Sequence, residues 1–446
     1  MTTTTPSTTT SPAGTPTGTP TLIKGARILG GAVADILLVG GRIAEVGRIS
    51  TAAEHNVVDA DGLVALPGLV DLHVHLREPG REDAETVATG AAAAAAGGFT
   101  AVLAMANTNP VTDTAEAAER VLDLGRDTGL VDVQPVGAVT KGLAGEELAE
   151  LGLMARSRAA VRVFSDDGHC VDDARVMRRA LEYVKAFGGV ISQHAQDPRL
   201  ADRNACCHES ELSGRLGLPG WPGIAEESIV ARDVMLARHT GSRLHIAHVS
   251  TAGSVEVVRW AKRQGIDVTA EVTPHHLLLT SDLLMSYDPV FKVNPPLRPE
   301  EDVRALREGL ADGTVDAVAT DHAPHARHDK EHAFVDAAFG MVGLETSLPV
   351  VSDVMVQSGL LDWAGVARVM SVNPARIARL GEHGQDLVAG SPANVTLVDP
   401  YAVTTVDRAT SLSLSRNNPW HGRTLTGAVM ATYLRGRLTA REGRLA

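Results

Sequence analysis

Short apolar runs alternate with helical patterns through the middle of the chain, from residue 69 to residue 320. Eight such runs separated by helices predict an α/β fold, with the strands closed into a (β/α)8 barrel of the TIM type rather than an open sheet. The predicted strands are 69–75, 99–104, 132–138, 160–164, 190–194, 243–248, 267–271 and 316–320. The predicted helices are 83–96, 114–126, 172–187, 225–239 and 252–263.

The two ends of the chain have a different pattern, in which short strand-like runs are separated by glycine turns. A Gly-Gly pair at 40–41 lies between two alternating runs, which predicts a β-hairpin. Strand-like runs return at 393–398 and 427–434, so we expect the two ends to pair with each other. The predicted domains are a small composite β domain of residues 21–67 and 388–446 and a metal-dependent catalytic barrel of residues 68–387.

Residues 1–20 consist almost entirely of threonine, proline, serine and glycine. They lack the basic start and apolar run of a signal peptide, and they cannot bury a core. We therefore expect a disordered extension, or a misassigned start of the chain. No later apolar run is long enough to span a bilayer without interruption by glycine or charge, so no membrane partner is expected.

The charge and the cysteines limit the class of protein further. The net charge is −13 and no cluster of lysine and arginine stands out, which argues against a nucleic-acid partner. Cys170, Cys206 and Cys207 make no disulfide framework, so we expect a reducing compartment, the cytoplasm. These features fit an enzyme that acts on a small molecule.

The segment from Gly68 to Gly80 carries the strongest functional signal. It is a short apolar run that ends in His73 and His75, and residues two apart on a strand point to the same side. Both imidazoles therefore project together from the end of the strand, with a spacing that suits one metal ion. Arg77 follows within reach of whatever that metal binds.

A lone His-x-His is a weak signal, but further candidate ligands also stand at the ends of predicted strands. His194 ends one strand and Asp321 ends another. An acidic residue at the end of an apolar strand must bind a cation or find hydrogen-bond donors, because an unpaired buried charge is costly. Of His245 and His248, which face opposite ways, we choose His248 because it lies nearer the end of its strand.

Asp166 and Asp167 form a second acidic pair at a strand end. The alternative interpretation of this pair is an N-cap of the helix predicted at 172–187. Two carboxylates and four histidines suit two borderline divalent cations such as zinc. A bridging carboxylate would hold the ions about 3.5–4 Å apart, so that they share one activated hydroxide.

From about Leu22 to its C-terminus the chain resembles the dihydroorotases of the amidohydrolase superfamily. The motifs that carry the resemblance are Asp71–Gly80, Met105–Pro110, Phe164–Gly168, His248–Thr251, Val293–Arg298, Thr320–His325 and Phe339–Glu345. The resemblance implies a zinc enzyme that interconverts N-carbamoyl-L-aspartate and L-dihydroorotate, the third step of pyrimidine synthesis. A homodimer, or association with another pyrimidine-pathway enzyme, is a further expectation.

The same resemblance implies the roles of the site residues. His73 and His75 would bind one zinc ion and His194 and His248 the other, with Asp321 completing the first site and moving the proton. Asp167 and a hydroxide would bridge the two ions of each subunit. The implied substrate-binding residues are Arg77, Asn107, Asn294, His325, Phe339 and Gly340.

One departure from related enzymes keeps an alternative open. Hydantoinases and dihydropyrimidinases usually bridge their metals with a carboxylated lysine on the fourth strand, but residues 159–168 hold no lysine. An aspartate would take that place, and we prefer Asp167 over Asp166 because the aspartate of the family directly precedes the glycine. The sequence alone does not decide between the two.

The choice of substrate class depends on Arg77, which can pair with the free carboxylate of dihydroorotate through two hydrogen bonds. A plain hydantoin or dihydropyrimidine has no such carboxylate. The alternatives are therefore a cyclic amidohydrolase of the hydantoinase, dihydropyrimidinase or allantoinase type, and an inactive homologue that serves as a structural subunit. The second alternative is disfavoured because none of the six candidate ligands is missing.

Overall fold

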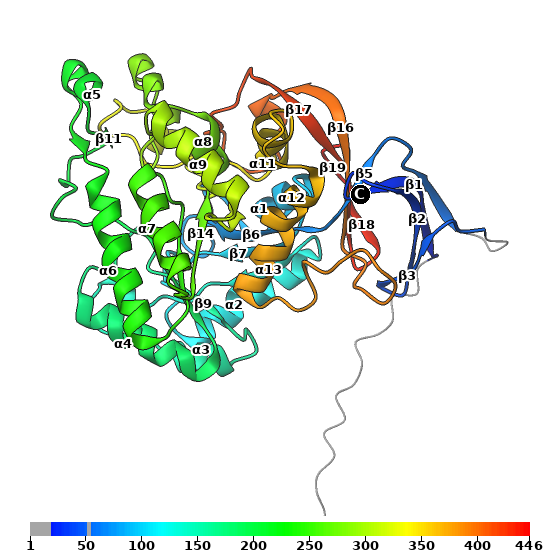
Figure 1. Cartoon of the computed structure of the whole chain (residues 1–446), viewed down its shortest axis with the longest axis horizontal. Helices are drawn as coiled ribbons and strands as arrows, with labels where there is room; N and C mark the ends of the chain where they lie inside the picture. The colour runs from blue at the N-terminus through cyan, green and yellow to red at the C-terminus, as the bar shows by residue number, and fades with distance from the viewer. Residues whose placement is uncertain (1–18, 51–54) are drawn as a thin grey trace, which may run out of the picture.

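The computed structural model describes residues 19–50 and 55–446. The extension predicted at residues 1–20 lies almost wholly outside the described residues. Figure 1 shows a large part built of strands and helices beside a smaller part built of strands. Strands in the large part run parallel, whereas most pairs in the small part are antiparallel.

Eight parallel strands form a three-stranded and a five-stranded sheet, in the orders β6-β7-β8 and β15-β14-β13-β10-β9. A separate parallel pair consists of β11(Cys207–His208) and β12(Gly220–Trp221). Single parallel bridges join the two sheets at both ends, Gly137 to Phe164 and Val74 to His322. Each predicted strand of the middle region is therefore present. The strands are β6(Leu69–Val74), β7(Phe99–Ala104), β8(Asp132–Pro135), β9(Val163–Phe164), β10(Val190–Gln193), β13(Leu244–Ile246), β14(Val268–Val272) and β15(Ala317–Val318).

Several strands are shorter than the sequence predicts. The strand predicted at 160–164 begins only at Val163, because Ala160 has a left-handed backbone with φ +48° and cannot continue a ladder. The strand predicted at 243–248 ends at Ile246, so His248 lies beyond it. The prediction that His245 and His248 lie on one strand, facing opposite ways, was therefore wrong, because only His245 is on the strand.

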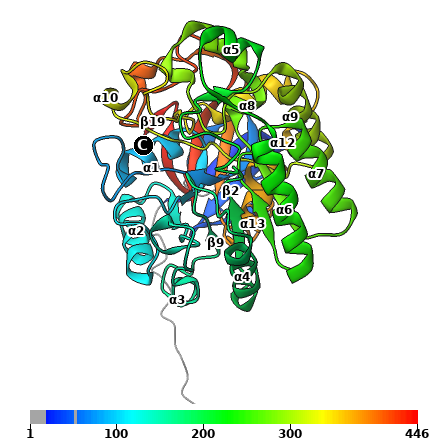
Figure 2. The ribbon, with the colours of Figure 1, turned by 90° about the vertical axis from the view of Figure 1, so that its left-hand side faces the viewer.

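Helices alternate with these strands and pack around them (Figure 2). The longer ones are α1(Val87–Ala96), α2(Ala115–Thr128), α4(Ala174–Val184), α6(Ile224–Thr240), α7(Ala252–Arg263) and α9(Glu300–Asp312). Shorter helices are α3(Leu151–Arg156), α5(Glu211–Leu216), α8(Pro274–Leu278), α10(Arg327–Lys330), α11(Ser347–Val351), α12(Trp363–Ala367) and α13(Asn373–Ala378). The helix α9 was not among the predicted helices.

Capping residues explain why two helices begin later than predicted. Thr86 caps α1 by accepting a hydrogen bond from the Thr89 amide, so the helix starts at Val87 rather than at residue 83. Asp173 caps α4 by accepting from the amides of Arg175 and Val176. The N-cap interpretation of the acidic pair at 166–167 is therefore wrong.

The small part contains a nine-stranded sheet to which both ends of the chain contribute. Its order is β19-β18-β17-β16-β5-β1-β2-β3, with β4 paired to β1. The two ends meet where β5 pairs antiparallel with β16, from Val64 opposite Val398 to Pro67 opposite Val395. The strands are β1(Thr21–Ile28), β2(Val33–Val39), β3(Arg42–Gly47), β4(Asn56–Asp59), β5(Val64–Pro67), β16(Val395–Thr405), β17(Thr424–Leu434), β18(Arg437–Arg441) and β19(Arg444–Leu445).

The sheet has an apolar cluster of its own, which includes Ile23, Ile36, Leu397 and Tyr433. The predicted hairpin joins β2 to β3, and both glycines at 40–41 have positive φ.

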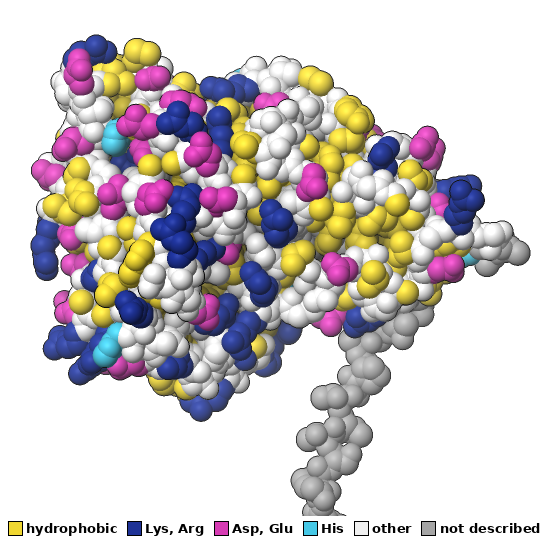
Figure 3. All heavy atoms as spheres, viewed as in Figure 1, with side chains coloured by type: hydrophobic (Ala, Val, Ile, Leu, Met, Phe, Trp, Pro, Cys, Tyr) yellow, Lys and Arg dark blue, Asp and Glu magenta, His cyan; other side chains and the backbone are white. Residues whose placement is uncertain are grey.

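On the face drawn in Figure 3, basic and acidic side chains are interspersed over the helical part, and hydrophobic side chains gather beside the sheet. Among the described residues, none of the helices is long and apolar enough to cross a membrane.

Candidate active site

The six predicted ligands come together where the parallel strands end. His73 is on β6 and His75 follows it, Asp167 follows β9, and His194 follows β10. His248 and Asp321 lie just beyond β13 and β15. All six side chains are buried. Catalytic residues of enzymes with this kind of fold usually lie at the C-terminal ends of the parallel strands. For this reason the six residues could be predicted to lie together from their positions at strand ends in the sequence.

Asp167 lies between two pairs of histidines. Its Oδ2 is 3.3 Å from Nε2 of both His73 and His75. Its other oxygen, Oδ1, is 3.3 Å from Nδ1 of His194 and 3.1 Å from Nε2 of His248. Each carboxylate oxygen therefore faces one histidine pair, an arrangement in which the carboxylate can bridge two cations.

Asp321 approaches only the first pair of histidines. Its Oδ1 is 3.1 Å from Nε2 of His75 and 3.6 Å from Nε2 of His73. Burial by itself raises the pKa of this carboxyl group, but the charges of His73 and His75 hold the pKa well below its usual range. Asp321 thus offers an ionised oxygen atom beside the first pair, where a cation could bind.

Asp166 points away from the histidines. Its Oδ1 accepts hydrogen bonds from the amides of Val139 (2.8 Å) and Thr140 (3.0 Å), and its Oδ2 accepts from the Thr140 hydroxyl. These donors satisfy the carboxylate fully. The structure therefore separates the two neighbouring aspartates, one among the histidines and one bound to backbone.

The donor set can hold metal ions. Ligand atoms of His73, Asp167 and His248 lie within 4.8 Å of one another, and so do those of His73, His75 and Asp321. In addition, Nε2 of His73 is buried and has no hydrogen-bond partner among the described residues, which is costly unless a cation or another group is bound there. Imidazole and carboxylate ligands together suit zinc and similar divalent ions.

Amide side chains hold two of these histidines in place. Nδ1 of His75 is 2.9 Å from Oδ1 of Asn107, so that Nε2 is left to face the aspartates. Nε2 of His194 is 2.9 Å from Oε1 of Gln196, which also accepts a hydrogen bond of 2.8 Å from Nδ2 of Asn294. Asn107 and Asn294, both predicted to bind substrate, thus also support the ligands. Gln196 was not predicted.

Glu271 is the main residue that the sequence interpretation missed. It is buried on β14, with Oε1 2.9 Å from Nδ1 of His73 and Oε2 3.0 Å from Nε2 of His245. Although burial alone raises the pKa of Glu271, hydrogen bonds from His245 and His73 lower it to about 2. The signal was available, because Glu271 is an acidic residue near the end of an apolar strand, as Asp321 is.

Comparison with known proteins agrees with this site. The family model described as Dihydro-orotase-like matches residues 62–254. The chain is 62% identical to the dihydroorotase of Streptomyces coelicolor over 425 residues, which cover 95% of this chain and 99% of that protein. It is 56% identical to the dihydroorotase of Mycobacterium tuberculosis over 426 residues, which cover 95% and 99% of the two chains. The chain belongs to the dihydroorotase family.

Solved structures with a similar fold are cyclic amide hydrolases as well. The L-hydantoinase (dihydropyrimidinase) of Arthrobacter aurescens superposes with a TM-score of 0.85 at 27% identity, over 96% of this chain and 98% of that chain. The dihydropyrimidinase of Brevibacillus agri superposes with a TM-score of 0.84 at 21% identity, over 96% of each chain. The α/β architecture is therefore that of the amidohydrolase enzymes, and the chain is a cyclic amide hydrolase of the dihydroorotase family.

In this dihydroorotase-family chain, Arg77 lies beside the ligand cluster. Its Nε donates a 3.0 Å hydrogen bond to the Pro324 carbonyl, which fixes the plane of the guanidinium. Burial lowers the pKa of Arg77 to about 10, so the side chain is still cationic at neutral pH. Within residues 19–50 and 55–446, none of the salt bridges involves Arg77. A half-buried cation with this environment suits an anionic ligand.

Of the remaining predicted substrate residues, His325 lies next to Arg77, and Phe339 and Gly340 lie next to His325. Nε2 of His325 is 2.6 Å from the Phe339 carbonyl and 3.4 Å from Nη2 of Arg77. Burial and the charge of Arg77 lower the pKa of His325 to about 2, so it is a neutral imidazole that donates to Phe339. Gly340 has φ +140°, and a Cβ there would lie 2.7 Å from Cβ of Ala323. Only glycine fits at this position.

Three of the site residues have an unusual backbone. Arg77, His248 and Asp321 have φ values of +60°, +30° and +46°, in the left-handed region that non-glycine residues rarely adopt. Such conformations persist only where the surrounding structure enforces them, and they concentrate at functional sites. The turns that follow β6, β13 and β15 therefore aim these side chains at the cluster.

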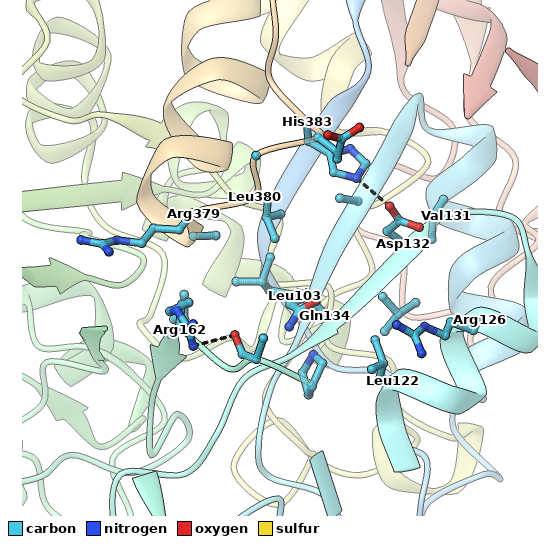
Figure 4. Close-up of a pocket in the computed structure, with 18 of the residues that line it drawn as sticks. Leu103, Leu122, Arg126, Val131, Asp132, Gln134, Arg162, Arg379, Leu380 and His383 are labelled. Carbon is cyan, nitrogen blue, oxygen red and sulfur yellow. Dashed lines mark hydrogen bonds and ion pairs between the residues drawn. The ribbon is translucent and has the colours of Figure 1, made fainter. Parts of the chain in front are cut away.

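A separate cavity of about 330 Å³ lies at the opposite ends of the strands (Figure 4). Apolar side chains such as Leu103 and Leu380 line it, and Nε2 of His383 lies 2.7 Å from Oδ2 of Asp132 at its edge. Asp132 also pairs with Arg435 from the nine-stranded sheet. None of the predicted ligands lines this cavity, and the Asp132 contacts connect the two parts of the structure.

Proposed function

We propose that this chain is a zinc-dependent dihydroorotase, which catalyses the reversible cyclisation of N-carbamoyl-L-aspartate to L-dihydroorotate and water. The observation that carries the proposal is the position of Asp167, with one carboxylate oxygen facing His73 and His75 and the other facing His194 and His248. Membership of the dihydroorotase family supports the substrate and the place in pyrimidine synthesis.

We further propose that the parallel strands form one closed (β/α)8 barrel of residues 68–387, capped on one side by a composite β domain of residues 21–67 and 388–446. The bridges from Gly137 to Phe164 and from Val74 to His322 support closure, because they connect the two parallel sheets at both ends. The β5–β16 pairing supports the composite domain. A cytoplasmic enzyme, as a homodimer or with another pyrimidine-pathway enzyme, is part of the same proposal.

Two zinc ions per subunit would be held by the six predicted ligands, His73, His75, Asp167, His194, His248 and Asp321. Zinc bound there would polarise the amide carbonyl and lower the pKa of a water molecule. Asp321 is the base and acid in this proposal: ionised in the free protein, it accepts a proton as the ring opens and delivers it to the departing ring nitrogen.

The ring carboxylate would be bound by Arg77, with Asn107, Asn294, His325, Phe339 and Gly340 around the ring. The Pro324 carbonyl occupies Nε of Arg77, which leaves the two terminal nitrogens for a carboxylate. A neutral His325 beside Arg77 adds no second positive charge. Its Nε2 donates a hydrogen bond to the Phe339 carbonyl.

The alternative is a hydantoinase-type activity, which is favoured by the likeness to the solved hydantoinase and dihydropyrimidinase structures. Two observations favour dihydroorotase. Asp167 takes the central place between the histidine pairs, and residues 159–168 contain no lysine. Arg77 offers a half-buried cation that a ring without a carboxylate does not need. An inactive structural homologue is disfavoured because the complete ligand set is assembled.

Removal of zinc tests the metal requirement directly. Treatment with a chelator should abolish turnover of dihydroorotate, and added zinc should restore it, because in the proposal zinc polarises the amide carbonyl and activates the water molecule. Bound metal is measured by atomic absorption beside the rate. Turnover that persists unchanged in protein shown to contain no metal would refute the proposal.

A further inference from the structure

Glu271 makes contact with both halves of the ligand cluster. Its Oε1 is 2.9 Å from Nδ1 of His73, which belongs to the first histidine pair. The same oxygen lies 3.4 Å from the backbone amide of His248, which belongs to the second pair. Its Oε2 is 3.0 Å from Nε2 of His245. One buried carboxylate thus joins β14 to β6 and β13.

These contacts determine which nitrogen of each imidazole carries the proton. Each oxygen of this carboxylate lies within hydrogen-bond distance of one imidazole nitrogen, and a carboxylate can accept from both, so the geometry favours Nδ1 of His73 and Nε2 of His245 as the donors. In neutral His73 the lone pair is then on Nε2, the atom that faces Asp167 and Asp321. That atom has no hydrogen-bond partner in the described part of the chain. A different tautomer would turn an N–H toward the cluster.

His245 holds Glu271 from the far side. Its Nδ1 lies 2.8 Å from the Thr269 hydroxyl, so both ring nitrogens are engaged and the ring cannot easily turn. Thr269 and Glu271 are two residues apart on β14 and point to the same side. A buried chain of hydrogen bonds therefore runs from Thr269 through His245 and Glu271 to His73.

We infer that Glu271 is a positioning residue for the metal centre. It holds His73 in the orientation and tautomer that leave Nε2 free for an ion, and through the His248 amide it fixes the distance between the two histidine pairs. His245, which lies outside the ligand cluster, acts by keeping Glu271 in place. This inference rests on the metal centre of the proposed function.

Glu271→Gln is the most direct test, because glutamine is nearly the same size but cannot accept from both imidazoles. Its amide group would face either His73 or His245 with an N–H, and that histidine would have to change tautomer. Loss of such a supporting carboxylate typically weakens metal binding about 10–100-fold. We expect a loss in this range for zinc, measured by competition with a chromogenic chelator at fixed pH.

One further readout and one control variant separate positioning from general stability. The absorption spectrum of the cobalt-substituted protein should change in Glu271→Gln, because the orientation of a ligand changes. Asp132→Asn is the matched control: it removes a similar histidine–carboxylate contact, 2.7 Å long, at the opposite ends of the strands (Figure 4). It should leave zinc affinity and the cobalt spectrum unchanged.

The outcomes are distinguishable. If the natural protein binds two zinc ions and Glu271→Gln binds them within twofold of the same affinity, with an unchanged cobalt spectrum, the inference is wrong and the proposed function stands. If the natural protein binds no zinc, the proposed function itself fails. If circular dichroism shows that Glu271→Gln is unfolded, Glu271→Asp decides, since it keeps the charge and should weaken zinc binding because the shorter side chain cannot reach both histidines.

Discussion

Asp167→Ala should lose bound metal and turnover together. Each oxygen of this carboxylate faces one histidine pair, so its removal takes a ligand from both ion positions at once. We expect the rate on dihydroorotate to fall by at least about 1,000-fold, which corresponds to about 4 kcal/mol of transition-state stabilisation. Zinc content is measured on the same preparation.

Asp166→Ala is the matched control for this change. It removes the acceptor of the Val139 and Thr140 amides, which should cost about 1–3 kcal/mol of folding free energy, since buried donors are left unsatisfied. Zinc content should stay at the natural level. If the two variants behaved the other way round, the assignment within the acidic pair would be wrong although a two-metal centre could survive.

Arg77→Ala should reduce activity on dihydroorotate, with a loss of about 2–5 kcal/mol of transition-state stabilisation, because the ring carboxylate would lose its cationic partner. Arg77→Lys should keep the charge but lose the bidentate hydrogen bonding to the carboxylate. Its activity should therefore lie between that of the natural protein and that of the alanine variant. Zinc content should be unchanged in both, since Arg77 is not among the ligand groups.

The specificity of this loss is measured with a ring that has no carboxylate, such as dihydrouracil. A dihydroorotase should process this ring poorly, and neither variant should change that rate much. Equal losses on both compounds would mean that Arg77 supports the structure through its bond to Pro324, and the hydantoinase-type alternative would gain weight.

Much of this arrangement could be predicted from the sequence because it depends on periodicity. Apolar runs that alternate with helical patterns gave the order of the parallel strands, and strand ends gave His73, His75, His194 and Asp321. The beginnings of helices were less accurate, since a single capping side chain such as Asp173 decides where a helix starts.

What the sequence could not decide depends on the direction of individual side chains. Asp166 and Asp167 are adjacent and chemically identical, and only the turn after β9 sends one to backbone amides and the other to the histidines. His248 reaches the cluster because its backbone turns to φ +30° beyond the strand, which periodicity does not reveal. The position of Glu271 near the end of an apolar strand could have been noticed, but its contacts with His73 and His245 on other strands could not.

The most direct test of the central claim is a substrate panel on one preparation with measured zinc content. Dihydroorotate, hydantoin, dihydrouracil and allantoin are each assayed with added zinc, and N-carbamoyl-L-aspartate is assayed in the direction of ring closure. We expect two zinc ions per chain and turnover of dihydroorotate and N-carbamoyl-L-aspartate far above that of the other three rings. Faster turnover of hydantoin or dihydrouracil than of dihydroorotate, in protein that holds its zinc, would contradict this expectation.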